Sequence, residues 1–160
     1  MKNNSQWILF EEWRGALFML VTVFTVSYAQ ALRVFSFGGV NPDLAPVALL
    51  VFSFFKVNIY AFFAALLLVF FLFTSSFWWF DMTMLALALF VVITVKLFFL
   101  RRGLARVLLS TILFTLIFYI FTRRFYLWQD LQPLVLELLL NCLFASLLFY
   151  IFSVLDRKAV

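Results

Sequence analysis

The chain has 160 residues, of which 68% are hydrophobic and 12% are charged, and its mean hydropathy is +1.16. Soluble domains are about 45–50% apolar and about 25% charged, so this composition excludes an ordinary soluble domain. The net charge is +5. The basic residues stand at the ends of apolar runs, which favours anchoring at a membrane surface over nucleic-acid binding.

The residues that carry most enzymatic and metal chemistry are scarce. The chain has no histidine, which is the usual metal ligand and the commonest general base. Its one cysteine, Cys142, lies within an apolar run and excludes a disulfide framework inside the chain. We therefore expect no catalytic, cofactor-binding or metal-binding residue, and no enzymatic activity.

The apolar residues form continuous runs, unlike the alternating pattern of a membrane β-barrel, and the chain has only four glycines and three prolines. Helices satisfy their own backbone hydrogen bonds in lipid and need about 20 residues for each crossing. We expect an all-α integral membrane protein, a single domain over residues 1–160 with about six transmembrane helices. In chain order, the predicted helices cover residues 15–32, 44–55, 57–73, 82–100, 104–122 and 133–155.

Near its end, the first predicted helix contains Ala29-Gln30-Ala31, which resembles the cleavage site of a secretory signal. Glu11 and Glu12 precede it, and acidic residues are unusual in the basic leader of such a signal. We interpret this segment as the first membrane helix.

The second predicted helix is short for a crossing and stops at Lys56. It could instead fuse with the third helix around Lys56 and Asn58, which would leave five crossings.

Charge placement favours six crossings with both termini in the cytoplasm of a bacterial inner membrane. With that topology, nine basic residues face the cytoplasm and three face the outside, as the positive-inside rule requires. The nine are Lys2, Arg14, Lys56, Lys96, Arg101, Arg102, Arg106, Arg157 and Lys158, and the three are Arg33, Arg123 and Arg124.

Ionisable groups within a membrane are expensive and mark candidate sites. Lys56 and Lys96 lie near the expected cytoplasmic ends of their helices, where a long side chain reaches the headgroups. Asp81 stands at the start of the fourth predicted helix, where a carboxylate caps the helix.

Glu137 and Asn141 are four residues apart and share one face of the sixth predicted helix. A carboxylate at this depth needs a partner, and Arg123 or Arg124 at the end of the fifth predicted helix is at a compatible depth. The two polar residues would form either a polar clamp between helices or a contact for a partner helix or small ligand.

The chain also resembles a known family, the rod-shape-determining protein MreD. The resemblance rests on its size, on three segments and on its basic end. The segments are Val40-Asn41-Pro42-Asp43-Leu44 before the second predicted helix, the basic turn Leu100-Arg101-Arg102-Gly103, and Leu140-Asn141-Cys142-Leu143-Phe144-Ala145-Ser146-Leu147-Leu148-Phe149 in the last helix, which is followed by Leu155-Asp156-Arg157. The chain departs from the family between Ala61 and Phe80, where it has no glycine and carries Phe77-Trp78-Trp79-Phe80.

The resemblance implies a non-enzymatic scaffold of the machinery for cell shape and lateral wall growth. The implied partners are the bitopic protein MreC, the actin-like MreB and the wall-synthesising enzymes. The implied fold is similar to the substrate-binding subunits of energy-coupling vitamin transporters. Pro42, Asp43, Asn141 and Ala145 are the residues that match family pattern positions.

Two alternatives remain open. A small-molecule-binding subunit of a transporter would need a polar pocket, for which Gln132, Glu137, Asn141 and Asp81 are the candidates. An accessory subunit of another large membrane complex would fit the motif-free, phenylalanine-rich sequence equally well.

Overall fold

The computed structural model describes residues 4–55, 58–73, 86, 89–90, 103–122 and 131–157. Its helices are α1 (Asn4–Ala31), α2 (Leu44–Phe52), α3 (Ile59–Phe73), α5 (Leu104–Thr122) and α6 (Gln132–Arg157). Within the described part, extended pairing is confined to one bridge between Phe37 and Val40. The prediction of an all-helical fold is therefore confirmed for these residues. Most of the helix predicted at 82–100 lies outside them, although residues 86, 89 and 90 are helical.

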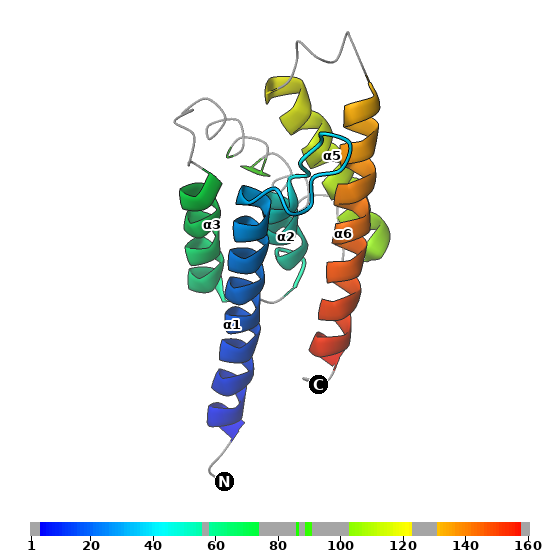
Figure 1. Cartoon of the computed structure of the whole chain (residues 1–160). Coiled ribbons are helices and arrows are strands. Elements are labelled where there is room, and N and C mark those ends of the chain that lie inside the picture. Colours follow the sequence, from blue (N-terminus) through cyan, green and yellow to red (C-terminus); the bar gives the residue numbers. More distant parts are fainter. Residues whose placement is uncertain are drawn as a thin grey trace.

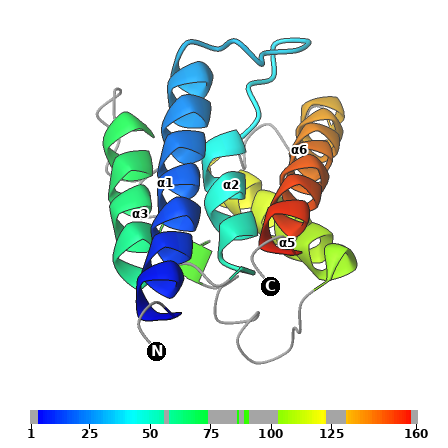
Figure 2. The same ribbon diagram turned by 90° about the horizontal axis from the view of Figure 1, so that it is seen from below.

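The helices form a bundle around α2 (Figures 1 and 2). Helix α1 begins and α6 ends at the same end of this bundle, which we call the terminal end (Figure 1). The connection from α1 to α2 and the start of α6 lie at the opposite end, which we call the hairpin end. Helix α5 crosses behind α6 and contacts it along much of its length.

Helix α2 is the buried centre of the bundle. All nine of its residues are buried, and it contacts α1, α3, α5 and α6. At about 1.5 Å per residue it is about 13.5 Å long, less than half of a hydrocarbon core of about 30 Å. The crossing predicted over residues 44–55 is thus a shorter helix that cannot cross a bilayer by itself.

Local hydrogen bonds mark the end of α2 and the start of α3. The Ser53 hydroxyl donates to the Leu50 carbonyl at 2.6 Å as α2 ends. The Asn58 side-chain oxygen then accepts the Tyr60 backbone N–H at 2.9 Å, which caps the start of α3. The two helices are separate and pack against each other, so the alternative of one fused helix is wrong.

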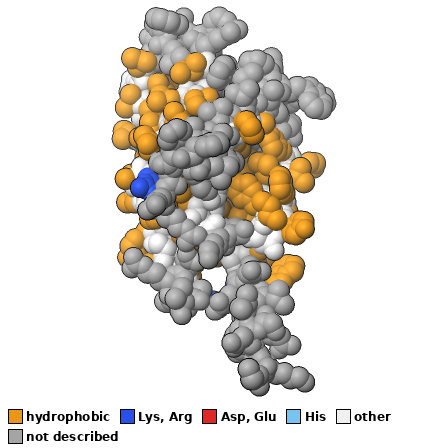
Figure 3. Space-filling view, turned by 180° about the vertical axis from the view of Figure 1, so that it is seen from behind, with side chains coloured by type: hydrophobic (Ala, Val, Ile, Leu, Met, Phe, Trp, Pro, Cys, Tyr) orange, Lys and Arg blue, Asp and Glu red, His pale blue; other side chains and the backbone are white. Residues whose placement is uncertain are grey.

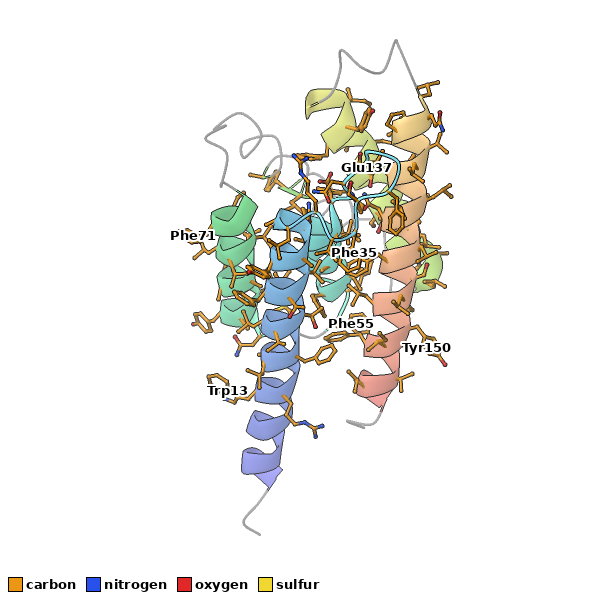
Figure 4. The ribbon with its side chains drawn as sticks, viewed as in Figure 1. Trp13, Phe35, Phe55, Phe71, Glu137 and Tyr150 are labelled. Carbon is orange, nitrogen blue, oxygen red and sulfur yellow. The ribbon has the colours of Figure 1, made fainter. Side chains whose placement is uncertain are left out.

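The outward faces of the longer helices are apolar. Exposed hydrophobic side chains recur about every four residues along α1, α3 and α6, and the described surface in Figure 3 is mostly hydrophobic. Members of these stripes are Leu17, Val21, Phe24 and Tyr28 on α1, Tyr60, Phe63, Leu67 and Phe71 on α3, and Val135, Leu139, Leu143 and Leu147 on α6. Trp13, Phe71 and Tyr150 point away from the bundle (Figure 4).

Among the described residues, one helical segment, Gln132–Leu155, is long and apolar enough to cross a membrane. The segments Ile59–Phe71 and Leu104–Ile120 are apolar but shorter. The length and composition of α6 are therefore those of a membrane span.

An aromatic cluster fills the space between α1, α2 and α6 toward the terminal end. The ring of Phe152 lies 5.0 Å from Phe18, 4.4 Å from Phe52 and 5.2 Å from Phe55, measured between centroids. Phe149 lies 5.5 Å from Phe55. Figure 4 shows Phe55 between the three helices. These rings hold α1, α2 and α6 together toward the terminal end.

Candidate functional site: a buried polar network at the hairpin end

Helix α1 ends in a Schellman motif, which turns the chain toward α2. The Val34 N–H donates to the Ala29 carbonyl and the Arg33 N–H to the Gln30 carbonyl, both at 3.0 Å. Arg33 has the left-handed φ of 56° that this motif requires and that glycine usually supplies. The motif satisfies carbonyl groups that the end of a helix otherwise leaves open.

A tight hairpin follows over residues 37–40. Gly38 and Gly39 have positive φ angles of 57° and 81°, as a type I′ turn requires. Phe37 and Val40 exchange backbone hydrogen bonds of 3.0 and 2.9 Å. A Cβ built on Gly38 would lie 3.4 Å from Cδ2 of Leu136, so the turn packs against α6.

Gln30 links α1 to the start of α2. Its side-chain oxygen accepts the backbone N–H of Ala45 at 3.0 Å, and its own carbonyl accepts the Asn41 side-chain amide at 3.3 Å. Ala45 stands in the first turn of α2, where backbone N–H groups have no partner within the helix. Gln30 therefore caps α2 from a neighbouring helix.

The remaining donors in that first turn are also satisfied. The Leu44 N–H donates to the Pro42 carbonyl at 3.0 Å, and the Val47 N–H donates to the Asp43 carbonyl at 3.2 Å. The other residue of this turn is Pro46, which has no N–H to satisfy. A buried helix start needs such complete pairing, because an unpaired buried N–H costs about 1–3 kcal/mol.

Pro42 and Asp43, matched by the MreD resemblance, both lie buried at this helix start. Asp43 is the N-cap residue of α2 and is 3% exposed, but its side chain makes no capping hydrogen bond to α2. The capping role falls to Gln30 instead.

Asn141 joins α6 to α5. Its side-chain nitrogen donates to the Thr115 hydroxyl oxygen at 3.0 Å, and both residues are completely buried. The Asn141 side-chain oxygen is buried too and has no hydrogen-bond partner among the described residues. Glu137, one turn earlier on α6, is 1% exposed. Figure 4 shows Glu137 at the same end of the bundle as Phe35 of the α1–α2 connection.

The inward face of α6 carries these residues in one stripe. Its buried members recur every three or four positions and are Leu134, Glu137, Asn141, Ala145, Leu148 and Phe152. Ala145 is completely buried on this face, where its small side chain lets a neighbouring element approach closely. Glu137, Asn141 and Ala145 therefore share the interior side of one helix.

Sequence reasoning missed Gln30 and Thr115. Both are polar residues within apolar runs, and this was the available signal. Arg123 and Arg124, the partners expected for Glu137 from the sequence, lie outside the described residues. Lys56, Asp81 and Lys96 lie outside them as well. Gln132, another residue considered for a polar pocket, is exposed at the start of α6.

The network is built to hold helices together. Among the described residues, no group of three or more histidine, cysteine or acidic side chains is placed to hold a metal ion. Single side-chain amides join α1 to α2, through Gln30, and α5 to α6, through Asn141. No protein-family model, curated protein or solved structure matches this chain.

Proposed function

We propose that this chain is a multi-pass protein of the bacterial inner membrane, with about six membrane-embedded segments and both termini in the cytoplasm. The observation that supports this most is the distribution of side chains in the described bundle. Apolar residues cover the outward faces of α1, α3 and α6, whereas Gln30, Glu137 and Asn141 are buried. A protein in water has the opposite preference, because its polar groups gain from exposure.

In this topology the chain crosses the membrane six times. Helices α1, α3, α5 and α6 and the segment 82–100 make five of the crossings, and α2 with the turn that follows it makes the other. Helix α2 is the sixth embedded segment, and its short length is tolerated because other helices surround it and its first turn is fully hydrogen-bonded. The excess of basic residues at the expected cytoplasmic ends sets the orientation.

Within this architecture, the proposed role is that of a non-enzymatic scaffold similar to MreD in the cell-shape and lateral wall-growth machinery. The polar residues of the described network serve contacts inside the bundle, which leaves the outward apolar faces for lipid and for other membrane proteins. The family-pattern residues Pro42, Asp43, Asn141 and Ala145 are all buried within this network or beside it. The proposed partners are an MreC-like bitopic protein, an MreB-like filament and the wall-synthesis enzymes.

A mild-detergent pull-down of the tagged full-length chain, with mass spectrometry of the captured proteins, tests the role. Recovery of an MreC-like single-span protein, together with rounding of cells that lose the chain, supports it. Recovery of an ATPase-coupled transport module, or of an unrelated complex with normal cell shape, overturns it.

A pair of variants adds a structural control. Glu137→Leu places an apolar side chain in the buried network and is expected to reduce the captured partner severalfold. Lys56→Gln removes a charge that we expect to reach water, and its capture should match the unmodified chain. Equal, negligible effects of the two changes would contradict a role for Glu137 in assembly.

A further inference from the structure

The connection between α1 and α2 exposes an unusual run of apolar side chains. Every residue from Ala31 to Gly39 is exposed. Val34 is 62% exposed, Phe35 39% and Phe37 57%, and one basic residue, Arg33, stands among them. A connection that faces water normally carries polar side chains, so this surface needs an apolar environment to cover it.

The depth of the hairpin identifies that environment. The candidate span Gln132–Leu155 has 24 residues and is about 36 Å long, which exceeds a hydrocarbon core of about 30 Å by about 3 Å at each end. Leu136 stands about 6 Å along this helix from Gln132, and therefore about 3 Å inside the hydrocarbon boundary. Because Gly38 packs against Leu136, the tip of the hairpin lies at the boundary between headgroups and acyl chains.

The backbone of the connection suits this position. The N–H groups of Arg33, Val34, Ser36, Phe37 and Val40 all donate to backbone carbonyls, at 2.9–3.1 Å. Non-helical backbone loses water partners near the acyl chains, so internal pairing of this kind is needed there. The Schellman motif and the I′ turn also fix the backbone that carries the exposed side chains.

The exposed side chains continue the apolar surfaces on either side. Tyr28 and Leu32 lead into the connection from the outward stripe of α1. Val135 and Leu139 lie on the outward stripe of α6, which flanks the position that Gly38 contacts. Lipid that covers these two stripes would cover the connection as well.

From these observations we propose that residues 32–40 form an interfacial anchor. Val34, Phe35 and Phe37 insert into the acyl–headgroup boundary of a phospholipid monolayer, and Arg33 binds lipid phosphate. Aromatic rings combined with a basic side chain are the usual composition of such anchors. The inference rests on the proposed function only in that α6 must cross a bilayer.

Nitroxide labels in proteoliposomes of phosphatidylethanolamine and phosphatidylglycerol test the anchor. Cys142→Ser removes the only cysteine, and Phe37→Cys or Val34→Cys then introduces one label on the hairpin. Leu143→Cys, on the outward face of α6, gives the reference for a label in lipid, and the free label in buffer gives the reference for water. The measurement is the ratio of collisions with oxygen, which concentrates in lipid, to collisions with a water-soluble nickel chelate.

The anchor predicts a ratio for both hairpin labels that lies severalfold above the free label and below Leu143→Cys. A ratio equal to that of the free label would overturn it, and so would protection from both quenchers, which indicates a protein contact. If the Leu143→Cys label also behaves as in water, the membrane assignment itself fails. If that label reads lipid and the hairpin labels read water, the anchor alone fails. Val34 lies outside the Phe37–Val40 bridge, so agreement of the two hairpin labels shows that labelling has not disturbed the turn.

Discussion

Replacing Thr115 with valine should destabilise the bundle by removing the hydroxyl that holds Asn141. Valine has nearly the shape of threonine, so the change leaves the packing of α5 almost intact. It removes the oxygen that accepts the Asn141 amide at 3.0 Å, in a place where neither residue is exposed. Without this acceptor, neither the nitrogen nor the oxygen of the Asn141 side-chain amide has a hydrogen-bond partner among the described residues.

The expected loss is about 1–2 kcal/mol. Side-chain hydrogen bonds between membrane helices average about 0.6 kcal/mol and reach about 1.7 kcal/mol, and an unsatisfied buried polar group costs about 1–3 kcal/mol. Thr111 provides a matched control on the same helix. It is equally buried, but its hydroxyl donates to the Val107 carbonyl of its own helix at 2.9 Å. Thr111→Val should cost less than about 0.5 kcal/mol, because that carbonyl keeps its helical N–H partner.

Reversible unfolding in mixed detergent–lipid micelles gives both free energies of unfolding. Adding Asn141→Leu to each variant completes two double-mutant cycles, and a coupling of about 1 kcal/mol is expected with Thr115 but not with Thr111. Equal costs for Thr115→Val and Thr111→Val, or zero coupling with Thr115, would refute the idea that this hydrogen bond joins α5 to α6.

Three further changes test other parts of the bundle by the same unfolding measurement. Gln30→Met keeps the side-chain length but leaves the Ala45 N–H without its acceptor, and should cost about 1–3 kcal/mol. Arg33→Gly should stabilise the protein by about 0.5–1 kcal/mol. The strain energy that glycine removes at this left-handed φ is larger than the free energy by which glycine's flexibility favours the unfolded chain. Phe152→Ala should cost about 3 kcal/mol or more by opening a cavity among the three rings that Phe152 contacts, whereas Leu147→Ala on the outward face should cost about 0.5 kcal/mol or less.

Each of these changes has an outcome that contradicts its reasoning. Tyr28→Phe removes a polar atom from the exposed face of α1, and a loss as large as that of Gln30→Met would show that capping is not the cause. A destabilising Arg33→Gly would mean that the arginine side chain contributes more than its backbone conformation costs. If Phe152→Ala and Leu147→Ala lower the free energy of unfolding by similar amounts, the aromatic cluster contributes no more to stability than a side chain on the outward face.

The sequence predicted the helical class of the described residues, because continuous apolar runs leave few other structures. The predicted helix at 104–122 coincides with α5, and that at 133–155 lies within α6. The start of α1 was missed: its helix begins at Asn4, ahead of the apolar run at residue 15, because helix formation does not require a hydrophobic side chain.

The candidate site was only partly predictable. The spacing of Glu137 and Asn141 placed them on one helix face, but no pattern within one helix names a partner on another. Thr115 and Gln30 act through contacts over 26 and 15 residues of sequence. Asp43 is a second example of a contact that the local sequence does not reveal. Its position before α2 suits a cap, but the capping oxygen comes from Gln30 of α1.

The central position of α2 has a consequence for the synthesis of the protein. Helix α2 is made before α5 and α6, which help to enclose it. A nascent chain that stops before residue 104 leaves a nine-residue apolar helix without two of the four described helices that contact it. Such a chain lacks the contacts through which α5 and α6 enclose α2 in the described bundle, and the apolar helix is left partly uncovered. Truncated products should therefore be degraded faster than the full-length chain, because α2 gains its contacts with α5 and α6 only after those helices are made.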